Sequence, residues 1–205
     1  VYDTFMEYTT KAYASVKSPL ELSFIPIHPG DILSYGGYHF EVKLLKGHTF
    51  GQCGLHEPEK KLMFVGDQLM TTIVPIVGTQ ETDLGMLKCY LNSLGDLKHN
   101  YKDCYFLPCH YGEIKNVEKE VNRIILGYLE KCEIMKHVLE EAGTALTTRD
   151  IGVRTYGRSQ GPPDYAHFAS CTQIWAKTFS CMEYMMGEGF IERSERDGII
   201  YWKAL

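Results

Sequence analysis

The sequence predicts an α+β fold in which short strands come first and helices follow. Between Leu20 and Leu69, short apolar stretches alternate with turn dipeptides such as Pro29-Gly30 and Gly36-Gly37, which is typical of an antiparallel meander. From Val117 onward, apolar residues recur at spacings of three and four, which is typical of amphipathic helices. Strands gathered before helices, rather than alternating with them, indicate an α+β class.

Composition and charge exclude several classes of protein. With 205 residues, of which 44% are hydrophobic and 23% charged, the chain can bury a core and is not disordered. A net charge of -5 argues against a protein held on nucleic acid by phosphate attraction. No apolar run approaches the roughly 20 residues of a membrane span. Seven cysteines without a C-x-x-C pair argue against a zinc ribbon or disulfide scaffold and favour a cytoplasmic location.

The strand predictions rest on alternating or continuously apolar segments bounded by turns, and the helix predictions on capping residues and apolar stripes. The predicted strands are Tyr38–Leu45, Gln52–Leu55, Lys61–Val65 and Tyr105–Pro108. The predicted helices are one capped by Asp83, one over Val117–Glu141 that Gly143 ends, a short one from Thr147-Thr148 through Val153, and one over Phe168–Gly187. Two short strands joined by a turn follow, so the last portion has a winged-helix outline.

Three loops that follow strand ends carry side chains of the kind that bind metals. His48 lies beside Gly47, Asp67 beside Gly66, and His110 near Gly112. We expect all three at the C-terminal edge of a sheet, where a neighbouring glycine lets backbone or metal approach closely. Two imidazoles and a carboxylate suit zinc, iron or manganese. Cys109 is interpreted as a small buried side chain rather than as a nucleophile.

Taken in order, these segments resemble the metallo-β-lactamase superfamily. The segments that carry the resemblance are Pro29-Gly30-Asp31-Ile32, Gly47-His48-Thr49-x-Gly51 and Phe64-Val65-Gly66-Asp67. Leu107 to Gly112 is similar to the family's P-G-H-G motif, but has Cys109 in place of glycine and Tyr111 inserted before Gly112. The tail resembles the winged-helix extension of the branch that includes β-lactamase-like protein 2 and glyoxalase-II-like hydrolases.

The resemblance implies a fold, a site and an activity. Residues 1–115 would form the C-terminal half of a metallo-β-lactamase αββα sandwich, and residues 116–205 a long helix and a winged-helix domain. His48 would bind one metal ion, His110 a second, and Asp67 would bridge both as the catalytic carboxylate. The implied cofactors are two divalent cations, zinc first, with iron and manganese as alternatives. A metal-bridging hydroxide would hydrolyse an ester, thioester, lactone or phosphodiester, in a small molecule or single-stranded RNA.

The family's H-x-H-x-D-H motif is absent from this sequence. We therefore expect this chain alone to be inactive, and the missing N-terminal half to come from the same longer protein or from a second chain. A first residue of Val1 rather than Met favours a fragment. An apolar sheet surface would then be exposed, and would be covered by that half or by a second copy.

The alternative is a non-catalytic module that uses the winged helix for protein or nucleic-acid contacts. DNA is the disfavoured partner, because residues 150–205 hold six basic and seven acidic side chains.

Overall fold

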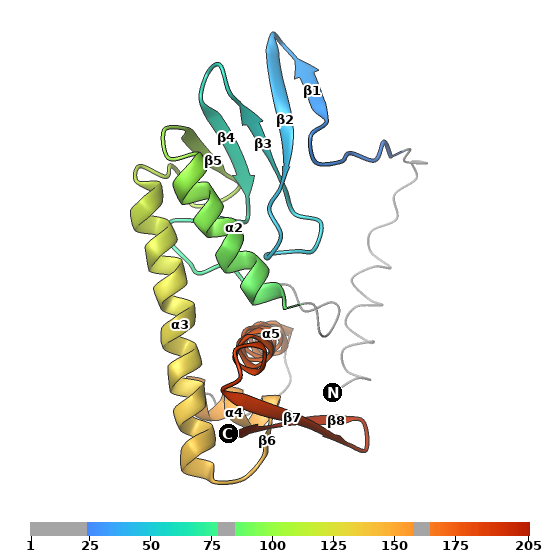
Figure 1. Cartoon of the computed structure of the whole chain (residues 1–205), viewed down its shortest axis with the longest axis vertical. Helices are drawn as coiled ribbons and strands as arrows, with labels where there is room; N and C mark the ends of the chain where they lie inside the picture. Colours follow the sequence, from blue (N-terminus) through green and yellow to red (C-terminus); the bar gives the residue numbers. More distant parts are fainter. Residues whose placement is uncertain (1–23, 78–84, 158–164) are drawn as a thin grey trace.

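Five strands of the first half form one sheet in the computed structural model of the chain, which describes residues 24–77, 85–157 and 165–205 (Figure 1). They are β1 (Ile32–Tyr35), β2 (Tyr38–Leu44), β3 (Cys53–Glu57), β4 (Leu62–Gly66) and β5 (Tyr105–Pro108). Strands β1 to β4 form an antiparallel meander, and β5 adds to β4 in parallel. The predicted α+β class and meander are confirmed.

The strand directions bring three loops to one edge of this sheet. Because β3 lies antiparallel between β2 and β4, those two strands run the same way, and β5 runs with them. The C-terminal ends of β2, β4 and β5 therefore meet at a common edge. The loops that carry His48, Asp67 and His110 all leave from it.

Helices α2 (Met86–Asn100) and α3 (Val117–Ala142) provide the core that covers one face of the sheet. Met63, Val65 and Phe106 point to this face and are fully buried in one cluster with side chains of both helices. Asn116 caps α3 by accepting a hydrogen bond from the Lys119 amide. Gly143 ends it in the left-handed conformation, as predicted.

The opposite face of the sheet, which we call the open face, exposes apolar side chains. The residues on this side of the sheet are identified by their cross-strand pairing. Partners in neighbouring strands are Val42 and Leu55, Leu55 and Phe64, and Leu62 and Tyr105. On it, Leu44, Phe64 and Tyr105 are 42%, 39% and 47% exposed, whereas Val42 is buried. An exposed apolar sheet surface was expected from the sequence, and this face has that character.

The tail forms a second small sheet packed with two helices. Its elements are β6 (Leu146–Thr147), α4 (Thr148–Tyr156), α5 (Tyr165–Gly187), β7 (Ile191–Arg196) and β8 (Ile199–Ala204). Strand β8 lies between β6 and β7. Thr147 and Asp150 form a reciprocal capping box at the start of α4, as the threonine pair predicted. Buried Trp202 donates a 2.9 Å hydrogen bond to the hydroxyl of Thr148.

Helix α5 joins the tail to the first half, since it packs against α2, α3 and α4. One buried cluster runs from Leu45 in the first half to Trp202 in the tail. The division into domains 1–115 and 116–205 stays a prediction. Among the described residues, no helix combines the length and apolar character needed to cross a membrane.

Element boundaries differ from the predictions at several places. Strand β3 continues through His56 and Glu57, which were expected in a turn, because these residues pair with Met63 and Leu62 of β4. Helix α4 continues to Tyr156 rather than ending at Val153. The predicted capping residue Asp83 lies outside the described residues.

Candidate metal centre

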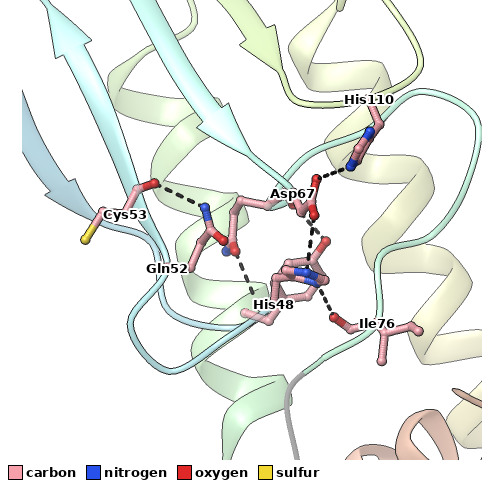
Figure 2. A network of polar contacts seen from close by, with 8 residues as sticks. His48, Gln52, Cys53, Asp67, Ile76 and His110 are labelled. Carbon is pink, nitrogen blue, oxygen red and sulfur yellow. Dashed lines mark hydrogen bonds and ion pairs between the residues drawn. The ribbon is translucent and has the colours of Figure 1, made fainter. Parts of the chain in front are cut away.

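Three side chains converge at the shared strand edge (Figure 2). The Nε2 atom of His48 lies 3.5 Å from Oδ2 of Asp67, and Nε2 of His110 lies 3.5 Å from Oδ1 of the same carboxylate. Each oxygen of Asp67 thus faces a different imidazole. The structure brings together all three residues that the sequence singled out, from three separate loops.

A backbone carbonyl fixes the orientation of His48. The loop after β2 is closed by a 2.7 Å hydrogen bond from the Leu45 amide to the Gln52 carbonyl. Within it, Nδ1 of His48 lies 2.7 Å from the carbonyl oxygen of Ile76. A carbonyl oxygen only accepts, so Nδ1 carries the hydrogen, and in the neutral ring Nε2 presents a lone pair toward Asp67. This arrangement is common for histidines that bind metals.

The carboxylate of Asp67 lacks a complete set of partners. It follows β4, whose last residue Gly66 has a φ of 56°, and its side chain is 30% exposed. The Oδ1 atom is buried and has no hydrogen-bond partner in the part of the chain that the structure describes. A buried carboxylate oxygen that accepts no hydrogen bond is costly, and a cation would relieve that cost.

His110 is held by the backbone on both sides. The Cys109 amide donates to the Gly66 carbonyl over 3.3 Å, which ties this loop to the end of β4. Tyr111 takes a left-handed φ of 67°, and its carbonyl accepts a 2.8 Å hydrogen bond from the hydroxyl of Thr71. The inserted tyrosine thus occupies a conformation that usually favours glycine. Cys109 is exposed, so its interpretation as a buried side chain was wrong.

Gln68 and Tyr90 support the site, and sequence reasoning missed both. The side-chain oxygen of the fully buried Gln68 accepts a 3.4 Å hydrogen bond from the His48 amide. Its side-chain nitrogen donates to the Lys46 carbonyl and to the Ser93 hydroxyl. The Tyr90 hydroxyl donates to the Gln68 carbonyl over 2.8 Å. Burial raises the pKa of Tyr90, so the phenol stays a neutral donor. The only sequence signal for this role was the position of Gln68 directly after Asp67.

The arrangement suits a cation but does not form a complete binding site. A lone pair of His48 faces a carboxylate at 3.5 Å, and neither atom can donate to the other. A positive charge between them, or a proton on the ring, makes the contact favourable. Over residues 24–77, 85–157 and 165–205, no group of three or more His, Cys, Asp and Glu side chains meets the geometry of a metal site.

Comparisons with known proteins identify the fold of this chain. The chain is similar to a metallo-beta-lactamase family protein from Thermus thermophilus, with 19% identity, a TM-score of 0.73, and coverage of 97% of this chain and 64% of that one. A beta-lactamase domain protein from Burkholderia ambifaria is 18% identical with a TM-score of 0.80, covering 100% of this chain and 58% of that one. The chain therefore spans about three fifths of these solved structures.

Similarity in sequence is confined to a short stretch. Hydroxyacylglutathione hydrolase GloC from Haemophilus influenzae is 50% identical over 40 residues, which are 20% of this chain and 19% of that protein. No protein-family model matches the sequence. The two solved structures from Thermus thermophilus and Burkholderia ambifaria nevertheless match nearly all of this chain with high TM-scores. The chain thus has the α+β fold of the metallo-β-lactamase proteins.

Proposed function

We propose that this chain carries part of the two-metal centre of a metal-dependent hydrolase that acts on an ester, thioester, lactone or phosphodiester. His48 holds one cation, His110 holds the other, and Asp67 bridges the two as the catalytic carboxylate. Zinc is the first candidate, with iron and manganese as alternatives. The observation that carries the proposal is the carboxylate of Asp67, whose two oxygens each face a different histidine Nε2 atom at 3.5 Å.

The side chains present fit such a centre. The buried Oδ1 of Asp67 accepts no hydrogen bond from the described residues, and a cation would supply a favourable electrostatic contact there. The hydrogen bond from His48 to Ile76 leaves the ring's other nitrogen free to coordinate. When bound, two divalent cations supply Lewis-acid activation of water and stabilise negative charge on the scissile group.

The remaining ligands come from outside the described residues in this proposal. One carboxylate and two imidazoles give too few protein ligands for two cations, each of which favours about four. The open face supports a further polypeptide layer, because Leu44, Phe64 and Tyr105 leave apolar surface exposed on it. We infer that a second sheet packs there, supplied by a preceding segment of the same protein or by a second chain. Without it, this chain is inactive.

We further propose that the tail is a winged-helix domain that forms one wall of the substrate cleft. The order of α4, α5 and the β7–β8 hairpin, with β6 paired to β8, supports this assignment. The proposed substrates are a small molecule or single-stranded RNA, and the nearly balanced charge of the tail disfavours DNA.

Zinc titration of the whole 205-residue chain by calorimetry tests the metal centre. The wild-type chain should bind Zn²⁺, and Asp67→Asn should abolish binding, because the amide lacks the charge and one acceptor oxygen. Glu140→Gln is the matched control, since Glu140 also lies beside a histidine, 3.7 Å from His137, far along α3. If Asp67→Asn binds Zn²⁺ as tightly as the wild type, the assignment of Asp67 as a metal ligand is wrong.

The alternative function is a non-catalytic binding module, which the incomplete ligand set favours. The coding sequence upstream of Val1 discriminates the two functions. An H-x-H-x-D-H motif there supports the hydrolase, whereas a sequence without it favours the binding module.

A further inference from the structure

Three consecutive carbonyl groups after Asp67 each accept a hydrogen bond from a side chain in a different part of the chain. The Val74 carbonyl accepts from Nζ of Lys177 in α5, over 2.9 Å. The Pro75 carbonyl accepts from the hydroxyl of Tyr128 in α3, over 2.6 Å. The Ile76 carbonyl accepts from Nδ1 of His48, over 2.7 Å. The third bond is the one that orients the candidate metal ligand.

Apolar side chains anchor the ends of this segment, since Met70 and Val77 are buried, and the hydrogen bonds fix the carbonyl groups between them. Residues 70–77 belong to no helix or strand. Proline at position 75 fixes its own φ but offers no amide hydrogen for a backbone ladder. Upstream, Arg123 of α3 donates to the carbonyls of Met70 and Ile73, over 2.7 and 3.2 Å. Side chains of α3 and α5 therefore act together with the buried Val77 in setting where the Ile76 carbonyl lies.

The position of Lys177 is unusual for a surface lysine. Its side chain is half-buried, and burial lowers the pKa of its ammonium group. Lysines on exposed helix faces normally extend into water. Lys177 instead directs its charge to a backbone carbonyl, and no ion pair between it and a carboxylate is found among the described residues. Such a placement costs solvation energy that the carbonyl contact partly offsets.

We propose that Lys177 and Tyr128 are positioning residues for the metal centre. By holding the carbonyls of Val74 and Pro75, they hold the next carbonyl where it keeps the hydrogen of His48 on Nδ1. The inference rests on the proposed role of His48 as a metal ligand. It assigns α5 of the tail a role in the geometry of a site that lies on the other half of the chain.

The test combines a reading of the His48 tautomer with zinc affinity, both on the whole chain. Two-bond ¹H–¹⁵N NMR at a pH where the ring is neutral reports which nitrogen carries the hydrogen, and His48→Gln assigns the signal. In Lys177→Met the Nδ1–H form should lose its dominance. Zinc affinity should fall about tenfold, the lower end of the loss that follows removal of a direct hydrogen-bond partner of a metal-binding histidine. Lys177→Arg should restore both. Lys203→Met, which removes an exposed tail lysine 3.4 Å from Glu192, should change neither.

Tyr128→Phe provides a second route if Lys177→Met is poorly folded, and should shift the tautomer in the same direction. The double variant that combines Lys177→Met with His48→Ala tests whether Lys177 acts through His48. If it does, Lys177→Met should not change zinc affinity further once His48 is removed. Zinc binding by the wild type, with tautomer and affinity unchanged in Lys177→Met and Tyr128→Phe, overturns the inference and leaves the proposed function standing. A shifted tautomer in a chain that binds no zinc upholds the positioning and removes the proposed function.

Discussion

Gly47 packs so closely against Tyr90 that a methyl group has no room between them. A Cβ atom built on Gly47 would lie 2.3 Å from Cδ2 of the tyrosine ring, and the glycine has a φ of 147°. The same tyrosine donates its hydroxyl hydrogen to the carbonyl of Gln68, next to Asp67. One side chain of α2 therefore positions both the residue before His48 and the residue after Asp67.

Gly47→Ala should destabilise the chain, because the new methyl group clashes with the ring and backbone of Tyr90. Overpacking of a tight core typically costs about 1–3 kcal/mol, and the positive φ adds strain. Urea unfolding measures the loss. Gly51→Ala, in the same loop but with open space around its Cβ, is the control and should be close to neutral. Equal stabilities of the two variants would contradict the packing argument.

Zinc should stabilise the chain, and removal of zinc by EDTA should reverse the effect. A ligand at a hundredfold excess over its dissociation constant adds about 2.7 kcal/mol to the free energy of unfolding. His110→Gln should remove most of this gain, because it deletes one of the imidazoles facing Asp67. His137→Gln, which changes an exposed histidine 3.1 Å from Glu141, should keep it. A zinc-dependent rise in Tm that survives in His110→Gln would place the ion elsewhere, for example on cysteine.

How far the sequence could predict this molecule depends on the kind of contact. Each side chain of the candidate site follows a strand, so local patterns found His48, Asp67 and His110. The strand Tyr105–Pro108 was also predicted with its observed limits, because it is a short apolar run before a loop. These features depend on residues close together in the chain.

Other features depend on contacts that no local pattern shows. Tyr128 was predicted as part of the apolar stripe of the long helix, and its hydroxyl contact with Pro75 joins positions 53 residues apart. Lys177 reaches a carbonyl 103 residues away. Every residue has a carbonyl group, so the sequence carries no mark of which one a donor will meet. Strand β6 has two residues and forms by pairing with β8, which again lies far along the chain.

The open face should make the isolated chain self-associate. Exposed apolar side chains on a sheet favour pairing with a second copy when the natural cover is missing. Phe64→Lys combined with Leu44→Lys should give a monomer, because both charges would have to be buried in such an interface. Light scattering measures the mass. Leu126→Lys, which alters a leucine of α3 that is 64% exposed, should leave the association unchanged. A wild-type chain that is monomeric at high concentration would argue against this interface.

Alkaline pH should destabilise the chain through Tyr156. Burial, with the neighbouring thiols of Cys181 and Cys132, raises the pKa of this phenol to about 12 from an ordinary value of 10.0. Between those values the unfolded chain loses the proton while the folded chain keeps it, so the free energy of unfolding falls as pH rises. Tyr156→Phe should make this decline shallower, as followed by urea unfolding at several pH values.

The buried phenols of Tyr90 and Tyr128 also have raised pKa values and act in the same direction. The lowered pKa of Lys177 has the opposite effect on the free energy of unfolding. At pH values between this lowered pKa and 10.5, the folded chain has lost the proton while the unfolded chain still holds it, so stability rises with pH. All three groups are present in the wild type and in Tyr156→Phe, so their effects cancel in the difference between the two curves. Tyr35→Phe, at a tyrosine that is 84% exposed, should reproduce the wild-type curve. Parallel curves for the wild type and Tyr156→Phe would show that this phenol ionises equally in both states.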